Sequence, residues 1–143
     1  MCIRDREVNK DVPKDSIKGF HILLVEDNEL NMEIAEFMIQ NEGASVTKAW
    51  NGQEALERFE QSRTGEYDAI LMDVMMPVLN GYEATEKIRA LNREDAKKIP
   101  IIAMTANAFT EDRRRSKEAG MDGHIIKPIN IELLVKVVAE LVQ

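Results

Sequence analysis

Short apolar runs alternate with longer amphipathic stretches along most of this chain. Four runs are rich in Ile, Leu, Val, Met and Ala, at 21–25, 67–72, 100–104 and 123–126, and a further short strand is expected at 44–49. Apolar runs of this length, separated by segments with helical spacing, are typical of strands buried in a parallel sheet. The pattern therefore predicts five parallel strands.

Amphipathic segments fill the intervals between these strands. Their apolar spacing predicts helices over 30–40, 51–61, 81–91, 110–120 and from 130 onward. Asn51, followed by Glu54 three residues later, has the form of a capping box, and Thr110 and Asn130 are expected to cap their own helices. The inward faces of the first and last helices are expected to carry Asn31, Ile34, Ala35, Met38 and Ile39, and Leu133, Leu134, Val137, Val138 and Leu141.

Five strand–helix units with short loops predict an α/β fold, a doubly wound five-stranded parallel sheet with helices on both faces. The expected strand order is 2-1-3-4-5, as in flavodoxin-like folds, with the switch point between strands one and three. A chain of 143 residues is long enough for one sizeable core and too short for two, and we expect residues 20–143 to form that domain. Residues 1–19 are polar and charged and are expected to be a flexible leader or linker.

Charge and composition argue against several function classes. The net charge of −7 opposes non-specific binding to nucleic acid, because a polyanion would be repelled. We expect no membrane contact by this domain, since no apolar stretch approaches the roughly 20 residues of a membrane span, and the charged N-terminus is unlike a signal peptide. The one cysteine, Cys2, cannot form an internal disulfide, which favours a reducing cytoplasm.

Charged side chains follow the predicted strands. Glu26 and Asp27 close the first run, Asp73 closes the third and Lys127 closes the fifth. The carboxyl ends of parallel strands lie along one edge of a sheet, where ligands bind. Three acids gathered there would repel one another and require a divalent cation, and a lysine beside them suits a phosphate or acyl-phosphate oxygen.

Four motifs at these strand ends carry a family resemblance. They are Leu24-Val25-Glu26-Asp27-Asn28, Leu71-Met72-Asp73-Val74-Met75-Met76-Pro77 with Asn80-Gly81, Ala103-Met104-Thr105-Ala106-Asn107, and Lys127-Pro128. Each alone is weak, but all four in this order resemble the response-regulator receiver domain, the phosphoacceptor module of two-component signalling. The resemblance covers about residues 20–143 and is greatest to the receivers of hybrid sensor histidine kinases.

The resemblance implies a role for each residue of the site. Asp73 would be the phosphoacceptor, and the donor would be a histidine of a kinase or of a histidine phosphotransfer domain. The cofactor would be Mg²⁺, held by Glu26, Asp27, Asp73 and the backbone carbonyl of Met75. Lys127 would pair with the phosphoryl oxygens, or with Asp73 before phosphorylation.

Four positions would govern the response. The resemblance makes Thr105 the switch hydroxyl, which donates to a phosphoryl oxygen while the face of the fourth helix and fifth strand shifts. His124 stands where the family often has a tyrosine or phenylalanine that swings inward, so a switching role and an ordinary strand histidine both stay open. Met75 and Asn107 occupy positions that tune autodephosphorylation, and an apolar Met75, which orients no water, favours a long-lived phosphoryl group.

The first predicted helix has an apolar edge beside its inward face, formed by Leu30, Ile34 and Phe37. We expect this edge to dock a helical, histidine-bearing donor, with simple core packing as the open alternative. Residues 113–115 are three arginines next to two acids, and a solvated, salt-bridged face is favoured over an anion site.

Three function classes compete. The leading one is a phosphorylatable signalling switch, which catalyses only its own phosphorylation and dephosphorylation and is otherwise not an enzyme. A phosphohydrolase would usually carry a second aspartate two residues after the nucleophile, where this chain has Met75. A binding module with a degenerate site is disfavoured because every site residue is present. The expected location is the cytoplasm, or the cytoplasmic part of a membrane-anchored sensor kinase, and a homodimer stays open.

Overall fold

A five-stranded parallel sheet organises the computed structural model, which describes residues 17–74, 80–105, 110–126 and 129–142. Its strands are β1 (His21–Val25), β2 (Ser45–Ala49), β3 (Ala69–Asp73), β4 (Ile101–Thr105) and β5 (Gly123–Ile126). They pair in the order β2-β1-β3-β4-β5, every pair parallel. The predicted fold class and strand order are both confirmed.

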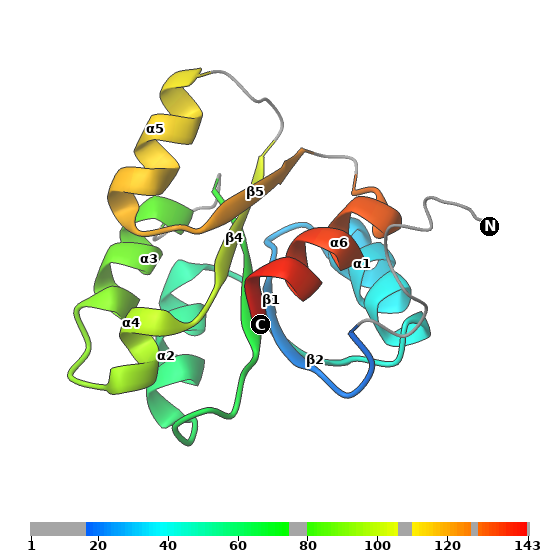
Figure 1. The fold of residues 1–143 in the computed structure, drawn as a ribbon, viewed down its shortest axis with the longest axis horizontal. Helices are drawn as coiled ribbons and strands as arrows, with labels where there is room; N and C mark the ends of the chain where they lie inside the picture. Colours follow the sequence, from blue (N-terminus) through cyan, green and yellow to red (C-terminus); the bar gives the residue numbers. More distant parts are fainter. Residues whose placement is uncertain (1–16, 75–79, 106–109, 127–128, 143) are drawn as a thin grey trace.

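Helices cover both faces of this sheet (Figure 1). One face carries α1 (Glu29–Asn41) and α6 (Ile131–Val142), and the other carries α2 (Gly52–Gln61), α3 (Gly81–Arg89), α4 (Glu94–Lys98) and α5 (Thr110–Ala119). Within the described ranges, the helices are too short or too polar to pass through a membrane.

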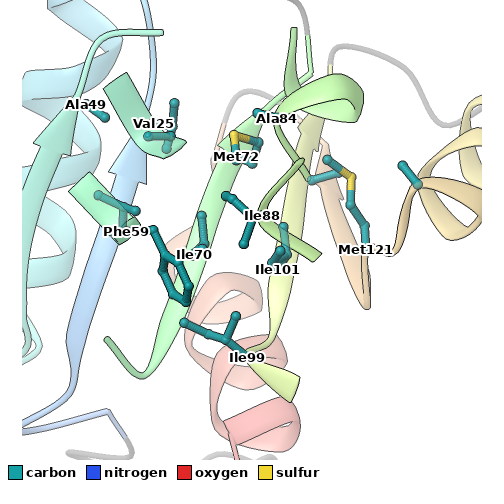
Figure 2. Close-up of a cluster of buried hydrophobic side chains, with 14 of the residues drawn as sticks. Val25, Ala49, Phe59, Ile70, Met72, Ala84, Ile88, Ile99, Ile101 and Met121 are labelled. Atoms are coloured by element: carbon teal, nitrogen blue, oxygen red, sulfur yellow. The ribbon is translucent and has the colours of Figure 1, made fainter. Parts of the chain in front are cut away.

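The central strand β3 supplies side chains to both cores. Ile70 and Met72 pack beneath α2 and α3, in the core shown in Figure 2, whereas Ala69 and Leu71 pack beneath α1 and α6. Successive side chains of a strand point to opposite faces, so a strand buried on both sides must be apolar throughout. All five residues of β3 are buried, including the final Asp73, which is therefore the exception that needs an explanation.

Side-chain caps fix most helix starts. The Oδ1 atoms of Asn51 and Asn130 accept the backbone N–H groups three residues later, at 2.9 and 3.1 Å, so both predicted caps are confirmed. The capping box predicted at Asn51 was wrong in its second bond, because Glu54 accepts the N–H of Trp50 instead. The prediction that Thr110 caps its helix stays a prediction, because the Thr110 side chain and residues 106–109 before it are outside the described part of the chain.

The inward faces of α1 and α6 are narrower than the sequence pattern predicts. Asn31 and Ile34 are exposed, and so is Leu133, so the prediction that these three face inward was wrong. Each helix touches the sheet through one stripe, whose fully or nearly fully buried members are Met32, Ala35 and Ile39 in α1 and Leu134, Val135 and Val138 in α6. Residues one position off the stripe turn toward solvent.

The packed part of the chain begins upstream of the expected boundary at residue 20. Ile17 is fully buried in the core beneath α1 and α6. The turn after it is fixed by a hydrogen bond from the N–H of Gly19 to the carbonyl of Gly43, at 2.9 Å. The leader predicted over residues 1–19 otherwise lies outside the described residues and stays a prediction.

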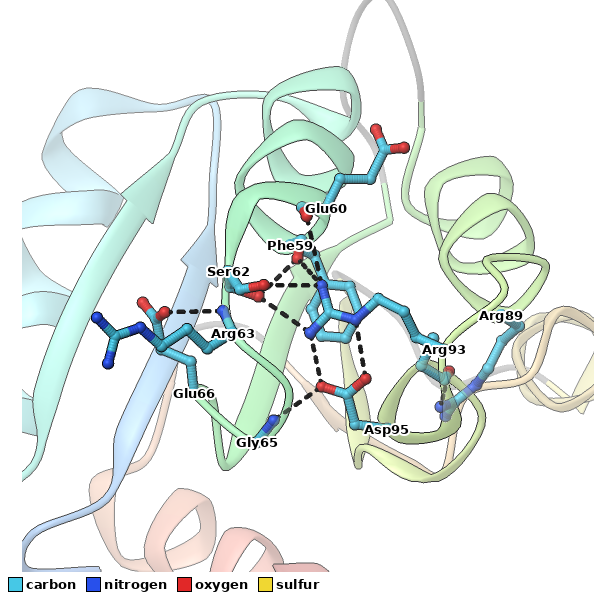
Figure 3. Close-up of polar contacts among 10 residues, drawn as sticks. Phe59, Glu60, Ser62, Arg63, Gly65, Glu66, Arg89, Arg93 and Asp95 are labelled. Carbon is cyan, nitrogen blue, oxygen red and sulfur yellow. Dashed lines mark hydrogen bonds and ion pairs between the residues drawn. The ribbon is translucent and has the colours of Figure 1, made fainter.

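The sequence pattern does not predict the short helix α4, which an arginine attaches to α2 (Figure 3). Arg93 donates to both carboxylate oxygens of Asp95, at 3.0 and 2.8 Å. It also donates to the carbonyls of Phe59 and Ser62 at the end of α2, at 2.6 and 3.1 Å, and its guanidinium lies 4.5 Å from the centre of the Phe59 ring. Asp95 in turn accepts the N–H of Gly65 at 2.9 Å.

The Arg93–Asp95 pair predicts a pH-dependent contribution to stability. Desolvation is the largest influence on the pKa of Asp95 and raises it, but the hydrogen bonds from Arg93 and Gly65 and the charge of Arg93 together hold that pKa below its usual 3.8. A carboxyl group with a lowered pKa in the folded state stabilises the fold above its unfolded pKa, and that stabilisation disappears as the pH falls through the folded pKa.

Replacing Asp95 by Asn should therefore lower the free energy of unfolding by about 1–3 kcal/mol at neutral pH. The difference from wild type should shrink as the pH falls below about 3.8. Urea unfolding at neutral and acid pH measures both effects. Glu94→Gln is the matched control, because its ion pair with Lys98 is exposed and should contribute little. A loss for Asp95→Asn that is constant with pH would contradict the prediction.

Candidate functional site

Three carboxylates gather at the carboxyl edge of β1 and β3. Glu26 and Asp27 follow β1, and Asp73 is the last residue of β3. The two strands are neighbours, with Val25 paired to Met72, so the acids are brought to the same level of the sheet. One carboxylate oxygen from each of the three lies within 4.8 Å of the others. The predicted convergence of these acids is confirmed.

The backbone around Glu26 explains why the acids stay together. The N–H of Glu26 donates to the carbonyl of Ala49 at the end of β2, at 3.1 Å, which extends the sheet pairing past β1. The Glu26 carboxylate accepts the N–H of Asn28 at 3.2 Å. Asn28 then caps α1 by accepting the N–H of Asn31 at 2.9 Å. The turn from strand to helix is thus fixed by the same residues that present the acids.

Burial makes this arrangement electrostatically demanding. Glu26 and Asp73 are 2% and 3% exposed, whereas Asp27 is exposed. Like charges in a buried site repel strongly, and a cation between them removes that cost. Oxygen ligands suit hard divalent cations such as Mg²⁺, around which opposite ligand oxygens are about 4 Å apart. The three carboxylate oxygens and the distances between them therefore fit a divalent cation with little rearrangement.

Backbone hydrogen bonds to β4 and to α3 also fix the end of β3. The N–H of Val74 donates to the carbonyl of Met104 at 3.2 Å, and the N–H of Gly81 donates to the carbonyl of Val74 at 3.3 Å. A Cβ added at Gly81 would clash with the carbonyl oxygen of Asp73 and would lie 2.8 Å from the Cα of Val74. Asn80 starts α3 just before it, in a full capping box with Glu83.

Gly81 is the functional position whose importance sequence reasoning missed. It was part of a motif, but a glycine after a capping Asn is equally consistent with an ordinary helix start. Only the fold shows that α3 approaches the backbone of Asp73 so closely that no side chain fits.

The structure places two of the other predicted residues and leaves three undescribed. Thr105 ends β4 and is 7% exposed, one register step past Met104, the partner of Asp73. His124 is half-buried on β5, paired with Ala103, and it lines a surface hollow of about 420 Å³ with Ser116 and Met121. Predicted roles also fall on Lys127, Met75 and Asn107, which lie outside the described residues.

The apolar edge of α1 is exposed next to the acids. Leu30, Ile34 and Phe37 are 64%, 44% and 70% exposed, so core packing does not explain them. Helix α1 begins two residues after Asp27, which puts Leu30 in the first turn beside the carboxylates. Glu29 and Glu33 are exposed on the same helix, and its last turn has no basic residue. The edge is thus an apolar surface in acidic surroundings.

Known proteins share this fold and much of this sequence. The family model of the response regulator receiver domain matches residues 22–139. The hybrid signal transduction histidine kinase I of Dictyostelium discoideum is 39% identical over 119 residues, which are 82% of this chain and 7% of that protein. The sensor protein GacS of Pseudomonas syringae pv. syringae is 35% identical over 138 residues, 95% of this chain and 15% of that protein. The chain thus spans a small part of these relatives.

Solved receiver structures are also similar. The receiver domain of the sensor histidine kinase PA1611 of Pseudomonas aeruginosa PAO1, solved with a magnesium ion coordinated in its active site cleft, is 42% identical with a TM-score of 0.78. The match covers 87% of this chain and 98% of that one. The receiver domain of Ssk1 of Saccharomyces cerevisiae, solved with the histidine phosphotransfer protein Ypd1, is 29% identical with a TM-score of 0.76 and coverages of 87% and 89%.

Gly81→Ala should disturb the acidic site by displacing the end of β3, which carries Asp73. The new methyl group would meet the carbonyl oxygen of Asp73, so the end of β3 or the start of α3 must move, at a cost of about 1–3 kcal/mol in unfolding free energy. The affinity for Mg²⁺, measured by isothermal titration calorimetry, should fall with it. Gly123→Ala is the control, because its Cβ would meet only the side-chain ends of Leu141 and Val137, at 3.2 and 3.4 Å. A Gly81→Ala variant that is as stable as the wild type and binds Mg²⁺ with the same affinity would contradict the expectation.

Proposed function

The chain belongs to the response regulator receiver domain family of two-component signalling, and we propose that it is a phosphoacceptor switch that takes a phosphoryl group from a partner's histidine onto Asp73. The observation that carries the proposal is the group of three carboxylates with two of them buried. A buried acid at the end of an otherwise apolar strand weakens the sheet, so its presence calls for a chemical role.

The fit of the acids to a divalent cation supports Mg²⁺ as the cofactor, as does the magnesium ion in the receiver of PA1611. Glu26, Asp27 and Asp73 would hold it, with the backbone carbonyl of Met75 as the ligand proposed from the sequence. When bound, it would neutralise charge on the phosphoryl oxygens and on Asp73. Asp27 is the exposed member of the three and would be the ligand that solvent reaches.

The proposed transfer exchanges one bond for another. An oxygen of the Asp73 carboxylate attacks the phosphorus of a phosphohistidine, the new O–P bond forms as the N–P bond breaks, and the bonding electron pair stays on the imidazole nitrogen. A carboxylate needs no general base for this step, because it is already deprotonated; positioning and charge compensation suffice.

Two residues are proposed to respond to the new phosphoryl group. Thr105, at the end of the strand beside Asp73, would donate its hydroxyl hydrogen to a phosphoryl oxygen. Lys127 follows Ile126, the register partner of Thr105, and its ammonium would pair with another phosphoryl oxygen. We propose that this response is the output of the domain, which catalyses only its own phosphorylation and dephosphorylation.

The exposed edge of α1 is proposed to dock the donor. Leu30, Ile34 and Phe37 form an apolar surface that starts at the acids, so a partner seated on it would hold its histidine near Asp73. The complex of the Ssk1 receiver with Ypd1 shows that a similar domain binds a histidine phosphotransfer protein. We therefore propose a histidine kinase or a histidine phosphotransfer domain as the partner, in the cytoplasm or in the cytoplasmic part of a sensor kinase.

Intact mass after incubation with a small acyl phosphate tests the proposed function. Wild-type protein with Mg²⁺ should gain one phosphoryl group, because the acyl phosphate replaces the donor histidine. EDTA should abolish the gain, and so should Asp73→Asn, which keeps the shape of the side chain and removes the nucleophilic charge. A gain that persists in Asp73→Asn would overturn the proposal, as would a folded wild-type protein that gains nothing from either an acyl phosphate or a phosphorylated histidine phosphotransfer domain.

Leu30→Arg tests the docking surface separately. Transfer from a phosphorylated histidine phosphotransfer domain should slow by about tenfold or more, because a charge replaces an apolar contact that the partner buries. Phosphorylation by the small acyl phosphate should be unchanged. Leu133→Arg is the matched control, a similarly exposed leucine on α6 that is 45% exposed. Equal transfer rates in the two variants would show that this edge does not dock the donor.

A further inference from the structure

An arginine of α5 lies over an aromatic ring beside the acidic site. The guanidinium carbon of Arg115 is 4.7 Å from the centre of the Tyr82 ring on α3, and Tyr82 is 8% exposed. Tyr82 directly follows Gly81, whose N–H donates to the carbonyl of Val74 at 3.3 Å. Helix α3 therefore begins in direct contact with the residue that follows Asp73.

A second arginine holds the far end of α3. Arg89 donates to the carbonyl of Gly120 through Nε and Nη2, at 3.0 and 2.8 Å, and to the carboxylate of Asp122 at 2.8 Å. Asp122 also accepts the N–H of Ile101 at the start of β4, at 2.9 Å. Gly120 has a φ of +107°, which favours glycine, and Arg89 packs directly over it. Helix α3 is therefore attached to α5 near both of its ends.

The two attachments differ in kind. Arg89 is fixed by charge-assisted hydrogen bonds to a backbone carbonyl and to a carboxylate that is itself bonded to β4. Arg115 is held over the face of a ring, a contact that weakens when the cation slides off it. The turn after α5 is thus held to α3 by hydrogen bonds at Gly120 and Asp122, whereas the Arg115 contact lies on α5 itself.

We propose that Arg115 is a positioning residue that couples phosphorylation of Asp73 to α5 through Tyr82, by a route that passes through neither Thr105 nor His124. The inference rests on the proposed function, since it requires a phosphoryl group on Asp73. Helix α3 would transmit the coupling, because it contacts the end of the acceptor strand β3 at one end and contacts α5 along its side.

Amide NMR spectra with and without beryllofluoride, a mimic of the phosphoryl group, test the coupling in the presence of Mg²⁺. In wild type, the amides of Val74 and of residues 114–116 should both shift. In Arg115→Ala, the Val74 shift should be retained, whereas the shifts of 114–116 should shrink by about half or more. The shifts at 120–122 should be retained, because Arg89 still holds that end. Arg114→Ala, an exposed arginine one position earlier, should behave as wild type.

Conservative variants separate coupling from structure. Tyr82→Phe keeps the ring and should keep the shifts of 114–116, whereas Tyr82→Leu should lose them as Arg115→Ala does. Shifts of 114–116 in Arg115→Ala that equal those of wild type would overturn the inference, and so would an equal loss in Arg114→Ala, which would point to charge alone. A wild-type protein in which Val74 itself does not respond would instead overturn the proposed function.

Discussion

The close approach of three carboxylates is the constraint on which the rest of this structure depends. A buried acid at the end of a strand is costly, and three carboxylates with oxygens within 4.8 Å of one another repel, so the backbone must hold them in place and a cation between them would lower the cost. The sheet holds the acids in place through backbone hydrogen bonds that continue beyond β1 and β3. The N–H of Glu26 donates to the carbonyl of Ala49, and the N–H of Val74 donates to the carbonyl of Met104. The strand order places these two strands at the centre, where neither can relax toward solvent.

The two faces of the sheet divide the remaining tasks. Helix α1 begins at the acids and carries an exposed apolar edge, which is the surface proposed to dock the donor. The opposite face joins its helices by arginines: Arg93 ties α4 to α2, and Arg89 and Arg115 tie α3 to α5. In the proposed function, the donor of the phosphoryl group would dock on the layer of α1, and the proposed coupling would run through the layer of α3 and α5.

The sequence was sufficient to predict the five-stranded sheet and the convergence of the three acids. Five predicted strands, each followed by helical spacing, allow few topologies other than this doubly wound sheet, and residues at the ends of parallel strands must share an edge. The helix α4 escaped detection because its five residues show no apolar period and Arg93 provides no side-chain cap. The exposure of Leu133 and the burial of Ile17 depend on how helices and turns rotate against the sheet, which local spacing does not determine. The tight contact at Gly81 likewise arises only when α3 packs against β3.

Chemical mapping of the phosphorylated residue tests the central claim most directly. Borohydride reduces an aspartyl phosphate to homoserine, so protein treated with an acyl phosphate and Mg²⁺, then reduced and digested, can be searched by tandem mass spectrometry. The account predicts homoserine at position 73 alone, dependent on both the acyl phosphate and Mg²⁺. A reduced side chain at Asp27 or Glu26 instead, or a phosphoryl group that remains on some other residue type, would contradict it.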